Sequence, residues 1–494
     1  MKVRFRETIR TEPGFTRYFL TLTKTIIELF TLTNVAVCCE PYSLPAMKFR
    51  SARVLPLLFR LFAGGLLMAA SPVSAATTIR WLTLSDGAWP DSVKKVIAAF
   101  EAENPDIKVE LDTYPFRQLF ETIEVRMKAQ DANLDLISVD VPLVASYTIR
   151  GYLAPLDEYF TADDIKSTWL EASGKAGTYN GHFMAAPQNT SSQFLYINRK
   201  LFQDAGITPP KGFGPNQPID YQQISDMASK DRWTWEQVVD AAKKLTKESD
   251  GKTDVWGFEF DQVSRLYQLQ CLGESLGQPL LSPDGLKASG YLNSEKWIRA
   301  AQWYSDLFNK WKISPKNVAP GESPTLFSGG KVGIFAGGEW NVPRFKEAGV
   351  DFLVAPFPYF AGGKPVTGTG SWHVGIAKSS QHKAEAAKFI KFLCASPKGS
   401  QIWFDAQGQV PATLALQTAI EQDAQYRSFP KDAYLLAICE ANNTAVNRPS
   451  TPGYLQVEDV FFSTFEDIRN GVNPKDALDG AARRLDRGLA QFRQ

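Results

Sequence analysis

Histidine and cysteine are rare in this chain. Among its 494 residues there are three His and five Cys, and neither HExxH nor CxxC spacing occurs. A zinc site or a thiol redox centre is therefore not expected. No complete Walker A sequence occurs either, since Gly330-Lys331 and Gly363-Lys364 are not followed by Ser or Thr, and we do not expect the chain to hydrolyse ATP. We accordingly predict neither a metal nor a cofactor.

An excess of positive charge is also missing. Basic and acidic side chains number 54 and 53, and the last 419 residues hold 44 basic against 49 acidic groups. This weakly acidic balance argues against nucleic acid or an anionic membrane as a partner. At roughly 100–200 residues per domain, the length suffices for two or three domains, each with a core of its own.

A targeting signal is indicated near the N-terminus. Lys48, Arg50 and Arg53 form a basic region, residues 55–70 are apolar except for Arg60, and Val73-Ser74-Ala75 is a small-residue cleavage pattern. This order is typical of a secretory signal peptide that begins at Met47. We interpret residues 47–75 as the signal peptide and residues 1–46 as a misassigned N-terminal extension. The mature protein is then expected in the periplasm.

The first part of the mature chain alternates between strand and helix patterns. Strands are predicted over 78–84, 107–111 and 134–141, and apolar residues at helical spacing separate them. This order predicts an α/β fold with a parallel, doubly wound sheet. Ligands bind at the carboxyl ends of strands in such sheets, where Asp86 and Asp140 fall. The alternative for each Asp is helix capping or turn formation.

The stretch from 327 to 341, FSGGKVGIFAGGEWN, combines a strand with a polar and aromatic end. Its apolar centre between two glycine pairs predicts a short buried strand that ends at Glu339 and Trp340. A sugar needs flat rings against its C–H faces and polar partners for its hydroxyls, and an indole beside a carboxylate provides both. The alternative is that Trp340 packs in the core.

Taken in order, several loose patterns resemble a known family. They are LDLISVD followed by GYLAPLD, LYINRKLFQDAGI, FSGGKVGIFAGGEW, and GSWHVGIAKSSQHKAEAAKFIKFL. The whole mature chain is similar to the extracellular solute-binding proteins of bacterial ABC importers, in the carbohydrate-binding group that includes maltose-binding protein. The resemblance implies two parallel-sheet α/β lobes joined by hinge crossings, with a ligand cleft between them. By position, the N-terminal lobe covers 77–187 and 364–409, and the C-terminal lobe covers 188–363 and 410–494.

The resemblance also implies a function and a set of binding residues. The chain would bind a neutral sugar or oligosaccharide, deliver it to the permease subunits of an ABC importer, act as a monomer and catalyse no reaction. The expected ligand contacts are the positions that match the family's cleft loops or lie close to them: Asp86, Trp89, Tyr114, Asp140, Asn189, Thr190, Glu339, Trp340, Trp372, Arg448 and Tyr454.

Two other classes of function remain as alternatives. An exported hydrolase is one, because Gly273-Glu274-Ser275-Leu276-Gly277 matches the nucleophile-elbow pattern; that pattern needs a strand before the Ser, and the preceding residues favour a helix. A glycosidase would need two facing carboxylates, for which Asp140 and Glu339 are the candidates. A binder of a sugar alcohol, a glycerol phosphate or a peptide is the other. Arg448 is the only basic residue that the sequence places in the site, which favours a neutral ligand.

Overall fold

The computed structural model describes residues 76–319 and 321–493. The predicted N-terminal extension and signal peptide, residues 1–75, lie outside the described residues. Within the described ranges, no helix is both long enough and apolar enough to cross a bilayer.

The first sheet is built mainly from the start of the described chain. Its order is β2 (Ile107–Tyr114), β1 (Thr77–Leu84), β3 (Leu136–Asp140), β14 (Trp372–Ala377) and β4 (Leu153–Ala154), and β7 (Ala186–Pro187) also pairs with β14. β1 runs parallel to both β2 and β3. The crossovers are α2 (Trp89–Glu103) and α3 (Phe116–Lys128). The predicted α/β class and the three predicted strands are confirmed.

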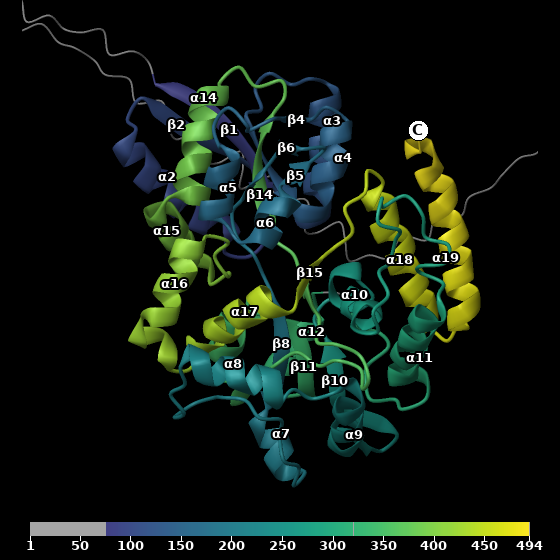
Figure 1. Cartoon of the computed structure of the whole chain (residues 1–494). Helices are drawn as coiled ribbons and strands as arrows, with labels where there is room; N and C mark the ends of the chain where they lie inside the picture. Colours follow the sequence, from purple (N-terminus) through teal and green to yellow (C-terminus); the bar gives the residue numbers. More distant parts are fainter. Residues whose placement is uncertain (1–75, 320, 494) are drawn as a thin grey trace, which may run out of the picture. The chain divides into compact units, whose positions relative to one another are not determined.

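A late segment of the chain completes this sheet. β14 pairs antiparallel with β3, with Trp372 opposite Asp140. In Figure 1, β14 and α14 (Lys383–Ile390), coloured green, lie among the purple and blue elements of the first sheet. α15 (Pro397–Gln407) packs beside α2, where the Trp403 ring meets Trp89 at 4.6 Å between ring centroids. Residues more than 200 positions apart therefore meet at the carboxyl end of β3.

The second sheet contains the predicted strand within 327–341. Its order is β12 (Phe352–Ala355), β8 (Gln193–Asn198), β11 (Val332–Gly338), β10 (Lys252–Phe260) and β9 (Lys247–Ser249). All seven residues of β11 are buried, because β8 and β10 flank the strand and helices cover the sheet. β11 runs parallel to β10 and antiparallel to β8, and these three strands lie side by side in Figure 1.

The other α-helices lie between the strands, except for the last two, which follow β15 (Ala445–Asn447). Those before β8 are α4 (Val144–Ile149), α5 (Ala162–Thr168) and α6 (Glu171–Ala176). Those between β8 and β14 are α7 (Arg199–Asp204), α8 (Tyr221–Lys230), α9 (Trp235–Leu245), α10 (Leu266–Ser275), α11 (Glu295–Asn309), α12 (Ser323–Ser328) and α13 (Asn341–Glu347). The remaining ones are α16 (Leu414–Gln422), α17 (Asp432–Asn443), α18 (Tyr454–Arg469) and α19 (Pro474–Leu489).

Two segments connect strands of the first sheet with strands of the second. Residues 188–192 join β7 of the first sheet to β8 of the second, and residues 356–371 lead back from β12 to β14. The two segments are bonded to each other, because the Thr369 hydroxyl donates to the Ser191 carbonyl at 2.6 Å and the Ser191 hydroxyl donates to the Gly370 carbonyl at 2.8 Å. Within the second segment, β13 (Thr367–Thr369) pairs with β15 (Ala445–Asn447).

Candidate ligand-binding cavity

A cavity of about 1030 Å³ opens where the ends of several strands meet these connecting segments. Its walls come from the turn after β1, from the ends of β3 and β11, from both connecting segments, and from α3, α10, α13, α15 and α18. This position is the one expected for a ligand at the carboxyl ends of parallel strands. The volume is at the upper end of the range for small-molecule sites.

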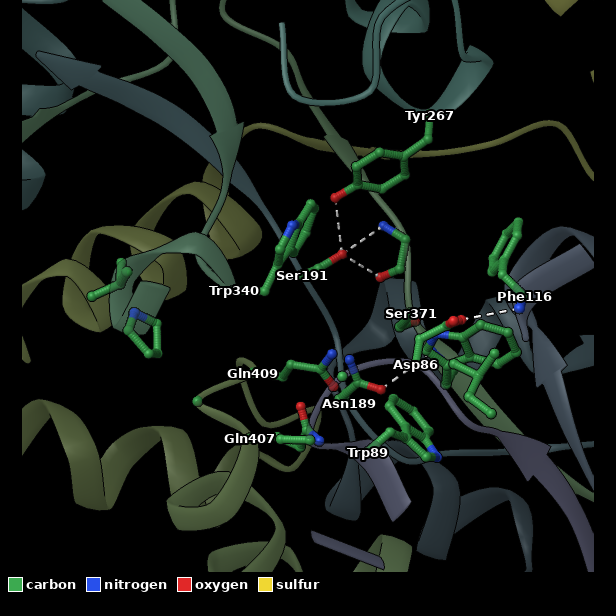
Figure 2. A pocket seen from close by; sticks show the side chains of 18 of the residues that line it. Asp86, Trp89, Phe116, Asn189, Ser191, Tyr267, Trp340, Ser371, Gln407 and Gln409 are labelled. Atoms are coloured by element: carbon green, nitrogen blue, oxygen red, sulfur yellow. Dashed lines mark hydrogen bonds between the residues drawn. The ribbon is translucent and has the colours of Figure 1, made fainter. Parts of the chain in front are cut away.

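Most of the predicted site residues come together around this cavity. Eight of the eleven line it: Asp86, Trp89, Asp140, Asn189, Trp340, Trp372, Arg448 and Tyr454. Several of them are labelled in Figure 2, together with Ser191 and Tyr267. Tyr114, Thr190 and Glu339 are not among the lining residues.

One aromatic wall is centred on Trp372. Its indole is partly exposed and lies almost parallel to the Phe120 ring, at 6.3 Å between centroids and an interplanar angle of 16°. Trp89 meets it edge-on at 5.7 Å and is 3% exposed, with its indole N–H donated to the Thr83 hydroxyl at 2.8 Å. Trp89 therefore supports the wall, and Trp372 and Phe120 offer ring faces to a ligand.

A second aromatic group in the wall is Trp340, which is bonded to Asp261 and packs against Gly338. Its indole N–H donates to Asp261 Oδ2 at 3.0 Å, and Asn341 Nδ2 donates to the same oxygen at 2.8 Å. Burial raises the pKa of Asp261 to about 6, although both donors favour the ionised form. A Cβ on Gly338 would lie 2.0 Å from the Trp340 ring, so the glycine is what lets the indole lie against the backbone.

A buried ion pair joins the end of β3 to the segment before α18. Arg448 Nη1 donates to Asp140 Oδ2 at 2.9 Å, Nη2 donates to Oδ1, and both side chains are nearly inaccessible. Arg448 Nη1 also donates to the Tyr454 hydroxyl at 3.3 Å, and that hydroxyl donates to Glu458. The two buried charges compensate each other, as buried charges must.

Glu339 is the clearest departure from the prediction. Its side chain is fully buried, and Oε2 accepts the Ser192 N–H at 3.1 Å. Trp340 faces the cavity, and Glu339 beside it points to the connecting segment instead. Burial raises the pKa of Glu339 to about 8. The carboxylate pair of Asp140 and Glu339 considered for a glycosidase therefore does not face a common space.

Tyr114 and Thr190 also lie away from the cavity. Tyr114 ends the edge strand β2, where its ring is half-buried against the core. Thr190 is buried, with its hydroxyl 3.2 Å from that of Thr369, so it links the two connecting segments. Asp86 lines the cavity and also accepts the Phe116 N–H at 3.0 Å, at the start of α3. Asp86 does not cap the helix that follows it, because the N-cap of α2 is Ala88; its carboxylate instead joins the turn after β1 to the start of α3.

Several residues that line the cavity were not predicted from the sequence. Tyr267 sits in the apolar helix α10, and its hydroxyl lies 3.1 Å from that of Ser191 (Figure 2). Phe116 and Phe120 belong to α3, where helical spacing suggested only packing. Gln407 is the last residue of α15, and Gln409 follows that helix. No local pattern distinguishes these residues, because only the fold brings them to the same cavity.

The charges around the cavity correct the prediction that Arg448 is the only basic residue of the site. Arg448 is joined there by Arg265, Arg344, Lys346 and Lys431, and five carboxylates line the same space: Asp86, Asp140, Glu347, Asp405 and Glu458. The sequence placed only Arg448 because the others lie on α13 and on loops that carry no motif. Five basic and five acidic groups leave the wall without net formal charge.

The nucleophile-elbow match has the wrong context. Ser275 is the last residue of helix α10, whereas the motif requires a strand before the Ser. Its side chain is buried and donates to the Lys364 carbonyl at 2.9 Å. The match is therefore a coincidence of sequence.

Comparisons with known proteins agree with this architecture. Residues 86–399 match the family described as bacterial extracellular solute-binding protein. The chain is 23% identical to the galactooligosaccharide-binding protein of Bacillus subtilis, over 79% of this chain and 85% of that protein. It is 24% identical to an sn-glycerol-3-phosphate-binding periplasmic protein of Rhizobium meliloti, over 85% of this chain and 96% of that protein.

Solved structures show the same fold at low identity. An ABC substrate-binding protein from Listeria monocytogenes in complex with cycloalternan superposes with a TM-score of 0.72 at 22% identity, over 84% of this chain and 99% of that one. A maltose/maltodextrin-binding domain from Bdellovibrio bacteriovorus bound to maltotriose gives a TM-score of 0.68 at 21% identity, over 84% and 100% of the two chains.

Proposed function

Since the chain belongs to the bacterial extracellular solute-binding proteins, we propose that it is the substrate-binding component of an ABC importer and that its ligand is a neutral carbohydrate. The observation that carries this proposal is the cavity itself, in which Trp340 and Trp372 line a space without net formal charge. Ring faces stack on the apolar faces of sugars, and the surrounding amides and hydroxyls bond to sugar hydroxyls.

The polar groups of the cavity support selectivity. Asn189, Ser191 and Gln407 line the cavity and already bond to Trp372, Gly370 and Ser92. Gln409 also lines it, and its buried Oε1 has no hydrogen-bond partner among the described residues. A sugar that left this acceptor unpaired, or broke one of the existing bonds without replacing it, would lose about 1–3 kcal/mol for each group, more than the 0.5–1.5 kcal/mol that a matched neutral hydrogen bond contributes. Mismatched hydroxyls would therefore decide which sugar binds.

Capture would use a movement of two lobes about the connecting segments. We assign 77–187 with 364–409 to one lobe and 188–363 with 410–494 to the other. A ligand that contacts both lobes binds the closed form more tightly and shifts the equilibrium toward it. The closed form would be recognised by permease subunits of the importer. No covalent step is involved, and the exported protein would work in the periplasm as a monomer.

A titration with two tryptophan variants tests the carbohydrate proposal. We expect Trp340→Ala and Trp372→Ala each to weaken binding of a cognate sugar by more than about tenfold. Each substitution removes a ring face that stacks on the sugar, and a tenfold change in the dissociation constant corresponds to about 1.4 kcal/mol of binding free energy. Trp311→Ala is the matched control, because Trp311 is half-buried and lies outside the cavity wall. A thermal-shift screen of neutral sugars identifies the sugar, because a ligand that binds the folded state raises the melting temperature.

Calorimetry then gives the affinities of the three variants. Unchanged affinity in both cavity variants would remove these rings from the site. New products after incubation with oligosaccharides would contradict a role in binding alone.

A phosphorylated polyol is the second candidate. One observation favours it: Arg265 lines the cavity, is largely buried and forms no ion pair with any residue in the described ranges, and its guanidinium lies 5.1 Å from the Phe116 ring centroid. A free guanidinium can bind a phosphate through two parallel hydrogen bonds. Including glycerol 3-phosphate beside glycerol in the screen separates the candidates, since only a phosphate site responds to the first and not to the second.

A further inference from the structure

A second hollow of about 200 Å³ adjoins the main cavity. The two share five lining residues: Phe116, Phe120, Arg265, Leu455 and Glu458. The other residues around the second hollow belong to α3 and α18, so it lies between these two helices. The same side chains therefore line both the main cavity and this hollow, where the two adjoin.

The walls of this hollow combine rings with free polar groups. Phe116 and Phe120 meet at 4.9 Å between centroids, and Phe462 of α18 also lines the hollow. Arg117, Glu121 and Asp459 lie at its rim, and none of the three has a hydrogen bond or ion pair from its side chain to another described residue. Ring faces with unpaired polar groups beside them suit a sugar unit, as in the main cavity.

The charges of this hollow limit the chemistry of its occupant. Four carboxylates (Glu121, Glu124, Glu458 and Asp459) face two guanidinium groups (Arg117 and Arg265). Glu124 is held by Arg150 at 2.6 Å and by the Tyr152 hydroxyl at 3.0 Å, and Glu458 accepts from Tyr454. The excess of negative charge opposes an acidic group, so a neutral unit is favoured.

We propose that the ligand is a linear neutral oligosaccharide whose terminal unit occupies the hollow between α3 and α18. The chain of sugar units starts in the main cavity, passes Arg265 and ends against Phe462. This inference rests on the proposed function, because it extends the same site. It distinguishes an oligosaccharide from a monosaccharide, which would fill only part of the main cavity and make no use of the second hollow.

The test compares ligands of increasing length. Unbranched neutral oligosaccharides of one to six units, built from glucose, galactose, mannose or xylose, are titrated by calorimetry against the full chain and Phe462→Ala. We expect the affinity of the unchanged protein to rise by roughly tenfold or more between the mono- or disaccharide and the longer members of one series. Phe462→Ala should remove this gain and leave the affinity for the shortest binding member within about twofold.

A control variant and a charged ligand complete the test. Phe492→Ala, which removes another half-buried Phe ring that lines neither hollow, should preserve the dependence on length. A uronate at the end of the best oligosaccharide should weaken binding. Affinity that does not change with length, or an equal loss at every length in Phe462→Ala, overturns the inference while the sugar-binding function stands. If no member of any series binds, the proposed function fails and this inference falls with it.

Discussion

Replacing Glu339 by Gln tests whether this side chain is a buried structural carboxyl or a contact for the ligand. Glu339 is fully buried beside the cavity wall, its Oε2 accepts the Ser192 N–H at 3.1 Å, and burial raises its pKa from 4.5 to about 8. At neutral pH the folded protein therefore holds a proton on this group, and the unfolded chain does not. An amide imitates the protonated acid and cannot ionise, so Glu339→Gln should keep the bond from the Ser192 N–H and lose only the longer one that Oε1 accepts from the Val410 N–H at 3.5 Å.

The direction of the pH effect follows from the raised pKa. A carboxyl that titrates higher in the folded state stabilises the protein fully below its unfolded pKa, and this contribution is lost as the pH rises through the folded pKa. Between pH 4.5 and 8 the loss is about 1.4 kcal/mol per pH unit, or up to roughly 5 kcal/mol for Glu339 alone. Relative to the unchanged protein, Glu339→Gln should therefore gain stability as the pH rises across this window.

Urea unfolding at pH 5, 7 and 9 measures this difference. We expect the free energy of unfolding of the variant, minus that of the unchanged protein, to increase by at least about 2 kcal/mol from pH 5 to pH 9. Sugar affinity should stay within about threefold, because Glu339 does not line the cavity. Glu248→Gln, at an exposed position of β9, is the matched control. The same pH dependence in variant and unchanged protein, or a loss of sugar binding with the fold intact, would refute the reasoning.

Two other substitutions address the cavity walls. Gly338→Ala should displace the Trp340 ring, since the new Cβ would lie 2.0 Å from it, and weaken sugar binding by more than about tenfold in calorimetry; Gly480→Ala, whose Cβ would meet nothing within 4 Å, should leave binding unchanged. Asp140→Asn leaves the Arg448 charge buried without its partner and should lower the free energy of unfolding by about 3–5 kcal/mol. The exposed pair of Asp351 with Arg199 provides the control Asp351→Asn, for which a loss below about 1 kcal/mol is expected; equal losses in the two variants would contradict the burial argument.

The alternation of strands and helices could be predicted from the sequence because burial of one face sets the spacing of apolar residues within each element. Apolar residues at helical spacing and near-continuous apolar strands predicted β1, α2, β2, α3 and β3 close to their observed bounds. The short strand in 327–341 was predicted for the same reason, with glycines marking its ends. Trp340 and Trp372 were predicted as site residues because Trp340 follows the predicted strand in 327–341 and because both match cleft positions of the family that the chain resembles.

The directions in which neighbouring side chains point could not be predicted from the sequence pattern. Glu339 and Trp340 are adjacent, and only the packing of residues 188–192 under the end of β11 decides that the carboxyl is buried while the indole faces the cavity. The same holds for Tyr267 of α10 and for Arg265, which directly precedes that helix. Nothing in their own sequence marks them, since their neighbours Ser191 and Phe116 are 76 and 149 positions away along the chain.

The fold class and the succession of strands and helices along the first part of the chain thus follow from local periodicity, which a linear sequence records directly because hydrophobic burial acts on each element separately. The composition of the cavity depends on distances between residues far apart in the chain, such as Asp140 and Arg448 or Asp261 and Trp340. Those distances arise only when both sheets and the segments between them are packed, and for that reason the tertiary structure alone decided which polar and aromatic groups share one space.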